Sequence, residues 1–210
     1  MKVIFVRHGQ TDWNKKKKIQ GQTNTTLNDD GKKESLAIRY ALEKDDISLI
    51  FSSPLERAYK TVEPLATKKK KPIICAKYLI ERGFGVVEGL EIENIKSRKE
   101  KEQSMVLRKT GIQDYRPEGG ESLVDVHFRV IEFLSFLLNI NLNGVVVCMT
   151  HGGVLDILYR VIMREPLSSK RNWMIPNGAF YVLERCNQDF QIVNWAETSH
   201  LNRYEILDEY

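Results

Sequence analysis

Short, uninterrupted apolar runs alternate along the chain with longer segments of helical periodicity. The runs Val3–Val6, Leu49–Phe51 and Val145–Met149 have strand length and contain no polar residue that would mark a solvent-facing side. The segments between them are long enough to carry the helical crossovers that connect parallel strands. The pattern therefore predicts an α/β fold with a mostly parallel central sheet.

A polar segment from Arg7 to Leu27 follows the first predicted strand, and we expect it to be irregular. Asn28 is placed to cap the helix that comes next. One face of this helix carries four residues at helical spacing, which are Leu36, Ala37, Tyr40 and Ala41. We expect this face to pack on the sheet.

A second helix is expected to start at Ser53-Pro54-Leu55-Glu56. In this pattern Ser caps the helix, Pro occupies the first helical position and Glu the third. The helix should run to about Thr67, because the cations of Lys68–Lys71 complement the helix dipole and Pro72 cannot continue the helix. Ile73–Cys75 then resumes an extended segment.

The second half of the chain continues the alternation. A helix opening at Ser122 carries an apolar stripe of Leu123, Val126, Val130, Phe133, Leu134, Leu137 and Leu138. Another helix should run from Gly153 to about Met163. The runs Ala179–Leu183 and Gln191–Val193 are expected to be late strands at a sheet edge.

The chain contains neither an internal repeat nor a linker long enough to separate domains. We therefore expect a single domain over residues 1–210. Glu91–Thr110 is so highly charged that we interpret it as a solvated helical excursion, and residues 91–116 as a whole as a polar, lid-like segment.

The charge pattern is that of an ordinary soluble protein. The 210 residues carry a formal net charge of +4, with charges of both signs throughout, which favours small anionic ligands. The lysine tetrads Lys15–Lys18 and Lys68–Lys71 lack the interleaved aromatic residues that would suggest base stacking. No nucleic-acid partner is expected.

Cys75, Cys148 and Cys186 occur singly and are odd in number, which argues against a disulfide framework or a zinc site and favours a reducing compartment. Only four apolar residues separate Met1-Lys2 from Arg7, too few for a signal peptide, and no stretch reaches the length of a membrane span. We expect a cytoplasmic protein without a membrane partner. Its oligomeric state is left open, with a homodimer as one option.

Two histidines directly follow buried strands. His8 stands between Arg7 and Gly9, and His151 follows Thr150. Because the carboxyl ends of parallel strands meet at one edge of the sheet, one shared site is expected. Arg7 offers a planar fork of donors that matches phosphate oxygens, and a neutral imidazole on His8 is a competent nucleophile toward phosphorus.

The remaining groups of a phosphoryl-transfer site can also be assigned. Arg57, in the first turn of the second helix, is the candidate for a second guanidinium clamp. His151 would stabilise charge on the equatorial oxygens. Glu81 precedes the turn Arg82–Gly85 and is the candidate acid for the leaving alkoxide, with Glu88 as the alternative.

These residues lie in motifs that resemble the histidine phosphatase superfamily, phosphoglycerate-mutase-like branch. The motifs are Arg7-His8-Gly9, Ser52-Ser53-Pro54-Leu55-x-Arg57-Ala58-x-x-Thr61, Glu81-x-x-Phe84-Gly85-x-x-Glu88-Gly89, Gly119-Gly120-Glu121-Ser122 and Thr150-His151-Gly152-Gly153. The resemblance implies a three-layer α/β/α sandwich, a phosphohistidine on His8 and proton donation by Glu81. It also implies a phosphate pocket of Arg7, Asn14, Gln20, Gly21, Arg57, His151 and Gly152, with no metal and no organic cofactor.

The family contains phosphatases and mutases. Gly153 stands where cofactor-dependent mutases usually have Asn, and the segment 91–116 is shorter than the insertion of the mutases. We therefore favour a phosphomonoesterase acting on a small phosphorylated metabolite, with a cofactor-dependent phosphoglycerate mutase as the alternative. Val87 stands where many of the phosphatases have Trp, so the sequence does not indicate which phosphomonoester is the substrate.

Other function classes fit the sequence less well. A catalytically silent module that binds phosphate ligands would keep the arginines but would not need His8 and Glu81. A nucleic-acid-binding role rests on the lysine tetrads alone. A zinc hydrolase lacks a close pair of histidines. His127 and His200 belong to no motif and receive no role.

Overall fold

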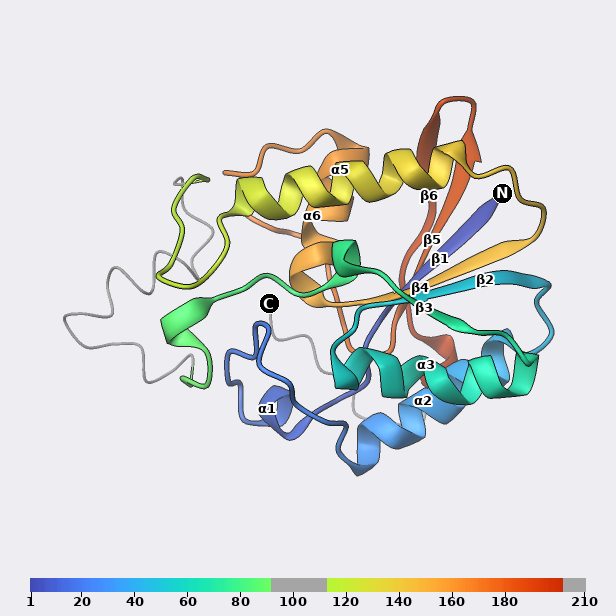
Figure 1. Ribbon diagram of the computed structural model, residues 1–210, viewed down its shortest axis with the longest axis horizontal. Coiled ribbons are helices and arrows are strands. Elements are labelled where there is room, and N and C mark those ends of the chain that lie inside the picture. The colour runs from blue at the N-terminus through green and yellow to red at the C-terminus, as the bar shows by residue number, and fades with distance from the viewer. Residues whose placement is uncertain (92–112, 202–210) are drawn as a thin grey trace.

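The computed structural model describes residues 1–91 and 113–201 of the chain, and these form a six-stranded sheet with helices on both faces (Figure 1). The strands are β1 (Lys2–Arg7), β2 (Ile47–Ser52), β3 (Ile73–Cys75), β4 (Val145–Thr150), β5 (Phe180–Cys186) and β6 (Asp189–Glu197). Their order across the sheet is β3-β2-β4-β1-β5-β6. The first four in this order are parallel, whereas β5 and β6 are antiparallel to their neighbours. The predicted, mostly parallel sheet is confirmed.

Two pairs of helices cover the sheet, so the architecture is the expected three-layer sandwich. The helices α2 (Asp29–Leu42) and α3 (Glu56–Lys69) lie on one face, and α5 (Leu123–Asn139) and α6 (Gly152–Met163) on the other (Figure 1). The connections contain the short helix α1 (Asp12–Lys15) and the 3-10 turns η1 (Lys77–Leu79) and η2 (Gly85–Val87), and the 3-10 turn η4 (Ser199–Leu201) follows β6.

The central strands are buried on both faces, which explains why their sequences are continuously apolar. In β1, Val3 and Phe5 pack toward α5 and α6, while Ile4 and Val6 pack toward α2 and α3. All six residues of β4 are buried. Two hydrophobic cores therefore hold β1 and β4 in place, and with them whatever follows their carboxyl ends.

The predicted packing face of α2 is wrong. Leu36 and Tyr40 are 44% and 59% exposed, whereas the buried face consists of Gly31, Glu34, Ser35, Ile38 and Leu42. The small residues on this face permit α2 to approach α3 closely, and the Ser35 hydroxyl donates to the backbone oxygen of Thr61 over 2.7 Å. The cap itself is as expected, since Asn28 accepts from Gly31 N.

The predicted start of α3 is also wrong. The helix begins at Glu56, with Leu55 at the cap position and no side-chain cap. Ser53 still belongs to the end of the sheet, because its N–H donates to the Met149 oxygen. The helix continues two residues past the expected end, and Lys70 leaves it in the left-handed conformation.

Other elements match their predictions more closely. Helix α5 is capped by Ser122 and buries the central residues of the predicted stripe, with Leu123 and Leu138 packed at its ends. Strands β5 and β6 are longer than expected, and β6 forms a sheet edge. The segment before Glu81 contains the 3-10 turn η1. The excursion expected over 91–110 lies outside the described residues, apart from its first position.

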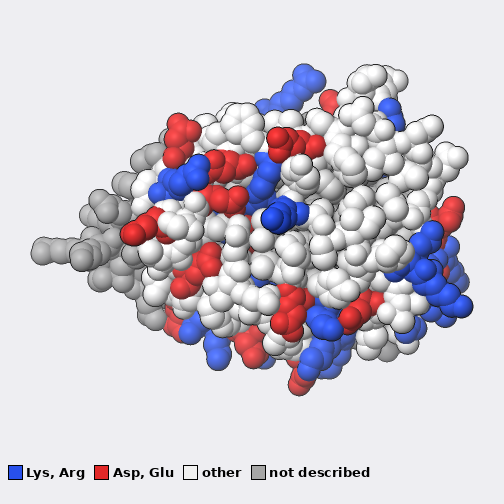
Figure 2. All heavy atoms as spheres, in the orientation of Figure 1, with Lys and Arg blue, Asp and Glu red and all other residues white. Residues whose placement is uncertain are grey.

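Charged side chains of both signs are interspersed over much of the face in Figure 2, with basic side chains gathered at the end where α3 ends. The exposed residues Lys68, Lys70 and Lys71 belong to that end. Helix α3 has 14 residues and is about 20 Å long, so this cluster lies far from its first turn. At that distance ionic screening leaves the cluster little influence on the carboxyl ends of the strands.

The three cysteines are free thiols, with Cys148 buried and Cys75 and Cys186 exposed. Within residues 1–91 and 113–201, no group of three or more His, Cys, Asp or Glu side chains is arranged to hold a metal ion. Over the same residues, no helix combines the length and the apolar character needed to cross a bilayer.

Candidate active site

The two histidines lie side by side because β1 and β4 are parallel neighbours. Arg7 at the end of β1 is paired with Thr150 at the end of β4, and the next residue on each strand is His8 or His151. The ring centroids of the two histidines are 5.0 Å apart and the rings are inclined by 56°. Both side chains are buried, with exposures of 2% and 0%. The structure thus brings together the pair that the sequence suggested.

The contacts of His8 define which nitrogen carries its proton. Nδ1 lies 2.8 Å from the Gly9 carbonyl oxygen, which can only accept, so Nδ1 holds the hydrogen. Nε2 is therefore the nitrogen with the lone pair, and the Arg57 Nε donates to it over 3.3 Å. The backbone of His8 is fixed on both sides, by the Thr150 oxygen and by the Asn177 side-chain amide.

Burial and neighbouring guanidinium groups keep both imidazoles neutral. Desolvation lowers the pKa of His8 well below its ordinary value near 6.5, and Arg57 and then Arg7 lower it further. The pKa of His151 is lowered by burial first and then by Arg57 and His8. A neutral His8 that carries its electron pair on Nε2 is the nucleophilic form of the side chain.

We predict that His8 and His151 take up protons at a lower pH than His127 on α5, whose pKa burial also lowers, though less. Such histidines reduce the free energy of unfolding as the pH falls below 6.5, because the unfolded chain then binds protons that the folded chain does not. Imidazole NMR titration measures each ring separately. A His8 or His151 ring that titrates together with His127, or above it, would contradict this electrostatic picture.

Arg57 lies in the first turn of α3 and is completely buried. Its Nη2 donates to the Gly21 oxygen over 2.7 Å, and its Nη1 donates to the Thr23 oxygen over 2.9 Å. Thr61, one turn further along α3, accepts from Gly9 N and donates to the Arg57 oxygen. These bonds fix the guanidinium relative to the residues that carry His8.

Arg7 and Glu34 are two buried ionisable side chains close to the residues that flank His8. Arg7 is 1% exposed and its Nη1 donates to the Ile175 oxygen. The Glu34 carboxyl, on the buried face of α2, accepts from Gln10 N over 2.7 Å. Burial raises the pKa of Glu34 to about 7, while the Gln10 bond and Arg7 oppose the rise. The sequence pattern does not predict a buried carboxyl here, because Glu34 lies outside the expected packing face of α2.

The other residues that the resemblance assigned to phosphate binding lie in the loop after β1 and at the start of α6. Asn14 is buried, and its Oδ1 accepts from the backbone and hydroxyl of Thr11. Gln20 accepts from the hydroxyls of Thr11 and Thr25. The Gly21 carbonyl binds Arg57, and Gly152 is the first residue of α6. The loop therefore reaches the histidine pair through Arg57.

Glu81 lies beside His151 at the amino end of α6. Glu81 is 3% exposed, and its carboxyl group accepts from Gly153 N, which is 3.1 Å from each oxygen, and from Arg82 N over 2.7 Å. Gly153 is the second residue of α6, two positions after His151. The helix amino end thus orients this carboxyl group toward the side of the site formed by β4.

Glu88, the alternative acid, has a different environment. Its oxygens accept from the backbone N–H groups of Gln22, Thr23 and Phe84, and from the Thr23 hydroxyl. These bonds join the loop after β1 to the loop that carries Glu81. Glu88 therefore connects two loops through hydrogen bonds. Of the two candidate acids, Glu81 is the one that lies close to the end of β4, which His151 follows.

Three polar residues beside the histidines were not assigned to the site from the sequence. The Ser53 hydroxyl lies 2.7 Å from His151 Nε2, Asn177 binds the His8 carbonyl, and Thr61 binds Gly9 N. Ser53 and Thr61 stand in a motif that was recognised, whereas nothing in the sequence singled out Asn177. Among the described residues, His151 Nδ1 and Asn177 Oδ1 are buried atoms without a hydrogen-bond partner in the protein.

Comparisons with known proteins identify similar sequences and similar folds. The sequence model of the histidine phosphatase superfamily (branch 1) matches residues 3–198. Phosphoglycerate mutase-like protein 4 of Arabidopsis thaliana is 32% identical over 98% of this chain and 89% of its own. Phosphoserine phosphatase 1 of Hydrogenobacter thermophilus is 26% identical over 98% and 97%. The mycobacterial glucosyl-3-phosphoglycerate phosphatase superposes with a TM-score of 0.81 at 26% identity, covering 93% of this chain and 98% of that one.

Proposed function

We propose that this chain, which belongs to the histidine phosphatase superfamily (branch 1), is a phosphomonoesterase that works through a phosphohistidine on His8. Its substrate is a small phosphorylated metabolite, and Glu81 donates the proton that the leaving alcohol needs. The observation that carries this proposal is the arrangement of His8, Arg57 and His151. A nucleophilic nitrogen, a guanidinium group and a second imidazole meet at one edge of the sheet.

In the first step the electron pair of His8 Nε2 attacks the phosphorus of the ester. A P–N bond forms while the bond from phosphorus to the ester oxygen breaks, and Glu81 gives its proton to that oxygen, so the alcohol leaves neutral. The ring of His8 becomes positively charged, and the Gly9 carbonyl that holds Nδ1–H stabilises this charge. Arg57 and His151 stabilise the equatorial oxygens of the phosphoryl group.

In the second step water attacks the phosphorus on the side that the alcohol has left. Glu81, now a carboxylate, takes a proton from this water, the P–N bond breaks and the electron pair returns to Nε2. Inorganic phosphate is released and Glu81 is protonated again. Arg7, Asn14, Gln20, Gly21 and the Gly152 amide complete the phosphate pocket in this proposal.

The test is release of inorganic phosphate from a panel of phosphomonoesters in the presence of EDTA. The panel includes phosphoserine and glucosyl-3-phosphoglycerate, since relatives of the chain are named for these substrates. We expect hydrolysis of at least one member, because every proton and charge in the scheme is handled by side chains of this chain. No release from any ester would favour a phosphate-binding module without catalysis.

The mutase alternative is tested with the same preparation. A cofactor-dependent mutase returns the phosphoryl group to a phosphoglycerate instead of losing it to water. We expect 3-phosphoglycerate to give no 2-phosphoglycerate when a bisphosphoglycerate is present to prime the enzyme. Interconversion faster than phosphate release would favour the mutase.

Gly153→Ala is predicted to lower kcat/KM by about 10²-fold, a loss typical of displacing a reacting group by about 1 Å. A Cβ at this position would lie 2.5 Å from Glu81 Oε1, so the flexible end of Glu81 has to move. Alanine favours a helix over glycine by up to about 1 kcal/mol, so the thermal stability should not fall. Steady-state kinetics and a melting curve separate the two effects. Full activity in the variant would show that the position of the Glu81 carboxyl does not matter.

A further inference from the structure

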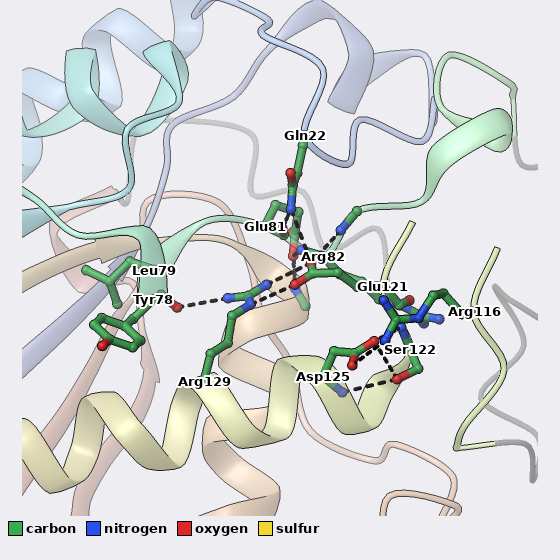
Figure 3. A network of polar contacts seen from close by, with 12 residues as sticks. Gln22, Tyr78, Leu79, Glu81, Arg82, Arg116, Glu121, Ser122, Asp125 and Arg129 are labelled. Carbon is green, nitrogen blue, oxygen red and sulfur yellow. Dashed lines mark hydrogen bonds and ion pairs between the residues drawn. The ribbon is translucent and has the colours of Figure 1, made fainter. Parts of the chain in front are cut away.

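The motif Gly119-Gly120-Glu121-Ser122 has no role in the proposed chemistry, yet Glu121 lies against the segment that carries Glu81 (Figure 3). The two segments pair through their backbones. Glu121 N donates to the Gly83 oxygen over 2.8 Å, and Phe84 forms a bridge with Gly120. The position of Glu81 therefore depends on residues that are about 40 positions away in the sequence.

The carboxylate of Glu121 binds the Glu81 segment directly. It accepts from Gly83 N over 2.8 Å, two residues after Glu81. It also accepts from the Gln22 side-chain amide over 3.1 Å, and the same amide donates to the Glu81 carbonyl over 3.0 Å. Glu121 thus holds the backbone at Glu81 and just beyond it.

Arg129 on α5 holds the other side of the segment. Its Nε and Nη2 form a two-point ion pair with the Glu121 carboxylate, at 3.0 and 3.2 Å, and its Nη1 donates to the Tyr78 carbonyl over 2.8 Å (Figure 3). Tyr78 lies three residues before Glu81. The side chains of Arg129 and Glu121 are 13% and 22% exposed, so water competes only partly for these bonds.

The Glu121–Arg129 pair is itself fixed to the start of a long helix. Ser122 caps the 17-residue helix α5 and forms a reciprocal capping box with Asp125, so the residue before the cap has a defined position. Arg129 comes two turns into the same helix. One rigid element therefore supplies a carboxylate and a guanidinium that together hold the chain before, at and after Glu81.

We propose that Glu121 and Arg129 are positioning residues for proton donation by Glu81. They act through Gly83, Gln22 and Tyr78, and they do not touch the reacting atoms. This inference rests on the proposed function, since it assumes that Glu81 protonates the leaving group. The inference assigns the Gly-Gly-Glu-Ser motif a role in the reaction in addition to its role in capping α5.

The experiment compares two leaving groups. p-Nitrophenolate departs without protonation, whereas the alkoxide of glycerol 1-phosphate needs a proton, so a misplaced acid slows the alkyl ester selectively. We expect Glu121→Ala to lower kcat/KM for glycerol 1-phosphate by about 10²-fold and for p-nitrophenyl phosphate by less than about 3-fold. Glu121→Gln keeps one acceptor oxygen for Gly83 N and should lose less.

Arg129→Ala should show the same selective loss on glycerol 1-phosphate. This variant tests the inference if Glu121→Ala does not fold. The matched control is Arg116→Ala, which breaks a 2.7 Å ion pair to Asp125 in the first turn of the same helix. Within the described part of the chain, Arg116 forms its hydrogen bond and ion pair with Asp125 and none with the Glu81 segment, so the ratio of the two rates should stay as in the wild type. An equal loss on both esters, or a loss on neither, would overturn the inference.

Two further variants separate this inference from the proposed function. His8→Ala should be inactive on both esters, and activity on both would remove the proposed function itself. Glu81→Gln should show the selective loss on the alkyl ester, and an equal loss would remove Glu81 as the donor. If both behave as expected while the Glu121 and Arg129 variants do not, the inference fails and the proposed function stands.

Discussion

His8→Ala is expected to lower kcat for phosphate release by about 10⁴-fold or more, the scale seen when a nucleophile is removed from a preorganised site. The phosphate pocket would remain, but water would have to attack the ester directly, without the covalent step that divides the reaction in two. The folded structure should tolerate the change, because a buried imidazole that resists protonation is replaced by a small apolar side chain. Steady-state kinetics on the best substrate of the panel measure the loss.

His127→Ala is the matched control for this variant. His127 lies on α5, partly buried, and belongs to neither the strand ends nor the Glu81 segment. Its kcat should equal that of the wild type. A His8→Ala variant that kept even a tenth of the activity would mean that His8 is not the nucleophile.

Arg57→Ala is expected to lower kcat/KM by about 10³-fold, the upper range for removing one preorganised donor to a developing charge. The guanidinium is the cation bonded to His8 Nε2, and it faces the position at which the phosphoryl group would be transferred. Arg57→Lys keeps the charge but loses the planar fork, so a loss of about 10²-fold is expected. Added guanidinium ion should restore part of the activity of the alanine variant.

Part of the loss of kcat/KM in Arg57→Ala would come from a change in structure, because the Arg57 side chain also donates hydrogen bonds to the carbonyl oxygens of Gly21 and Thr23. Leaving such groups unpaired costs about 1–3 kcal/mol each where they are buried, which a melting curve would show. Lys60→Ala on the same helix removes an exposed cation paired with Glu63, and it should change neither kcat/KM nor the melting temperature. Arg57→Ala with undiminished kcat/KM would remove the guanidinium from the mechanism.

The sheet and the histidine pair could be predicted because they depend on local patterns. A strand buried on both faces has to be apolar throughout, and Val3–Val6 and Val145–Met149 show this directly. Parallel pairing then sets their carboxyl ends together, so the residues that follow, His8 and His151, had to be neighbours once the two strands were adjacent.

The packing of α2 and the start of α3 could not be predicted because tertiary contacts override local preference. Leu36 and Tyr40 have the right spacing, but the helix buries Ile38 and the small residue Ser35 against α3. Ser53 has the sequence context of a cap, yet its hydroxyl lies against His151 Nε2. A capping pattern describes what a serine can do when no other partner is close.

The contacts around Glu81 could not be predicted from the sequence for another reason. The fold brings together Glu121, Gln22 and Glu81, whose segments are separated by about 40 to 100 positions. The periodicity of a sequence predicts local structure and does not predict contacts between such distant segments. Asn177, which holds the His8 carbonyl, is 169 positions from it. Groups of this kind support the reacting residues, and only the fold shows which of them meet.

The most direct measurement is to trap the covalent intermediate. The enzyme is mixed with a substrate labelled in its phosphoryl group, quenched within one turnover in alkaline denaturant, in which phosphohistidine survives, and digested for peptide mapping. The label should lie on the peptide that contains His8, attached through Nε2, and it should be absent in His8→Ala. Label on another residue, or a full turnover that leaves the protein unlabelled at every time point, would contradict the account.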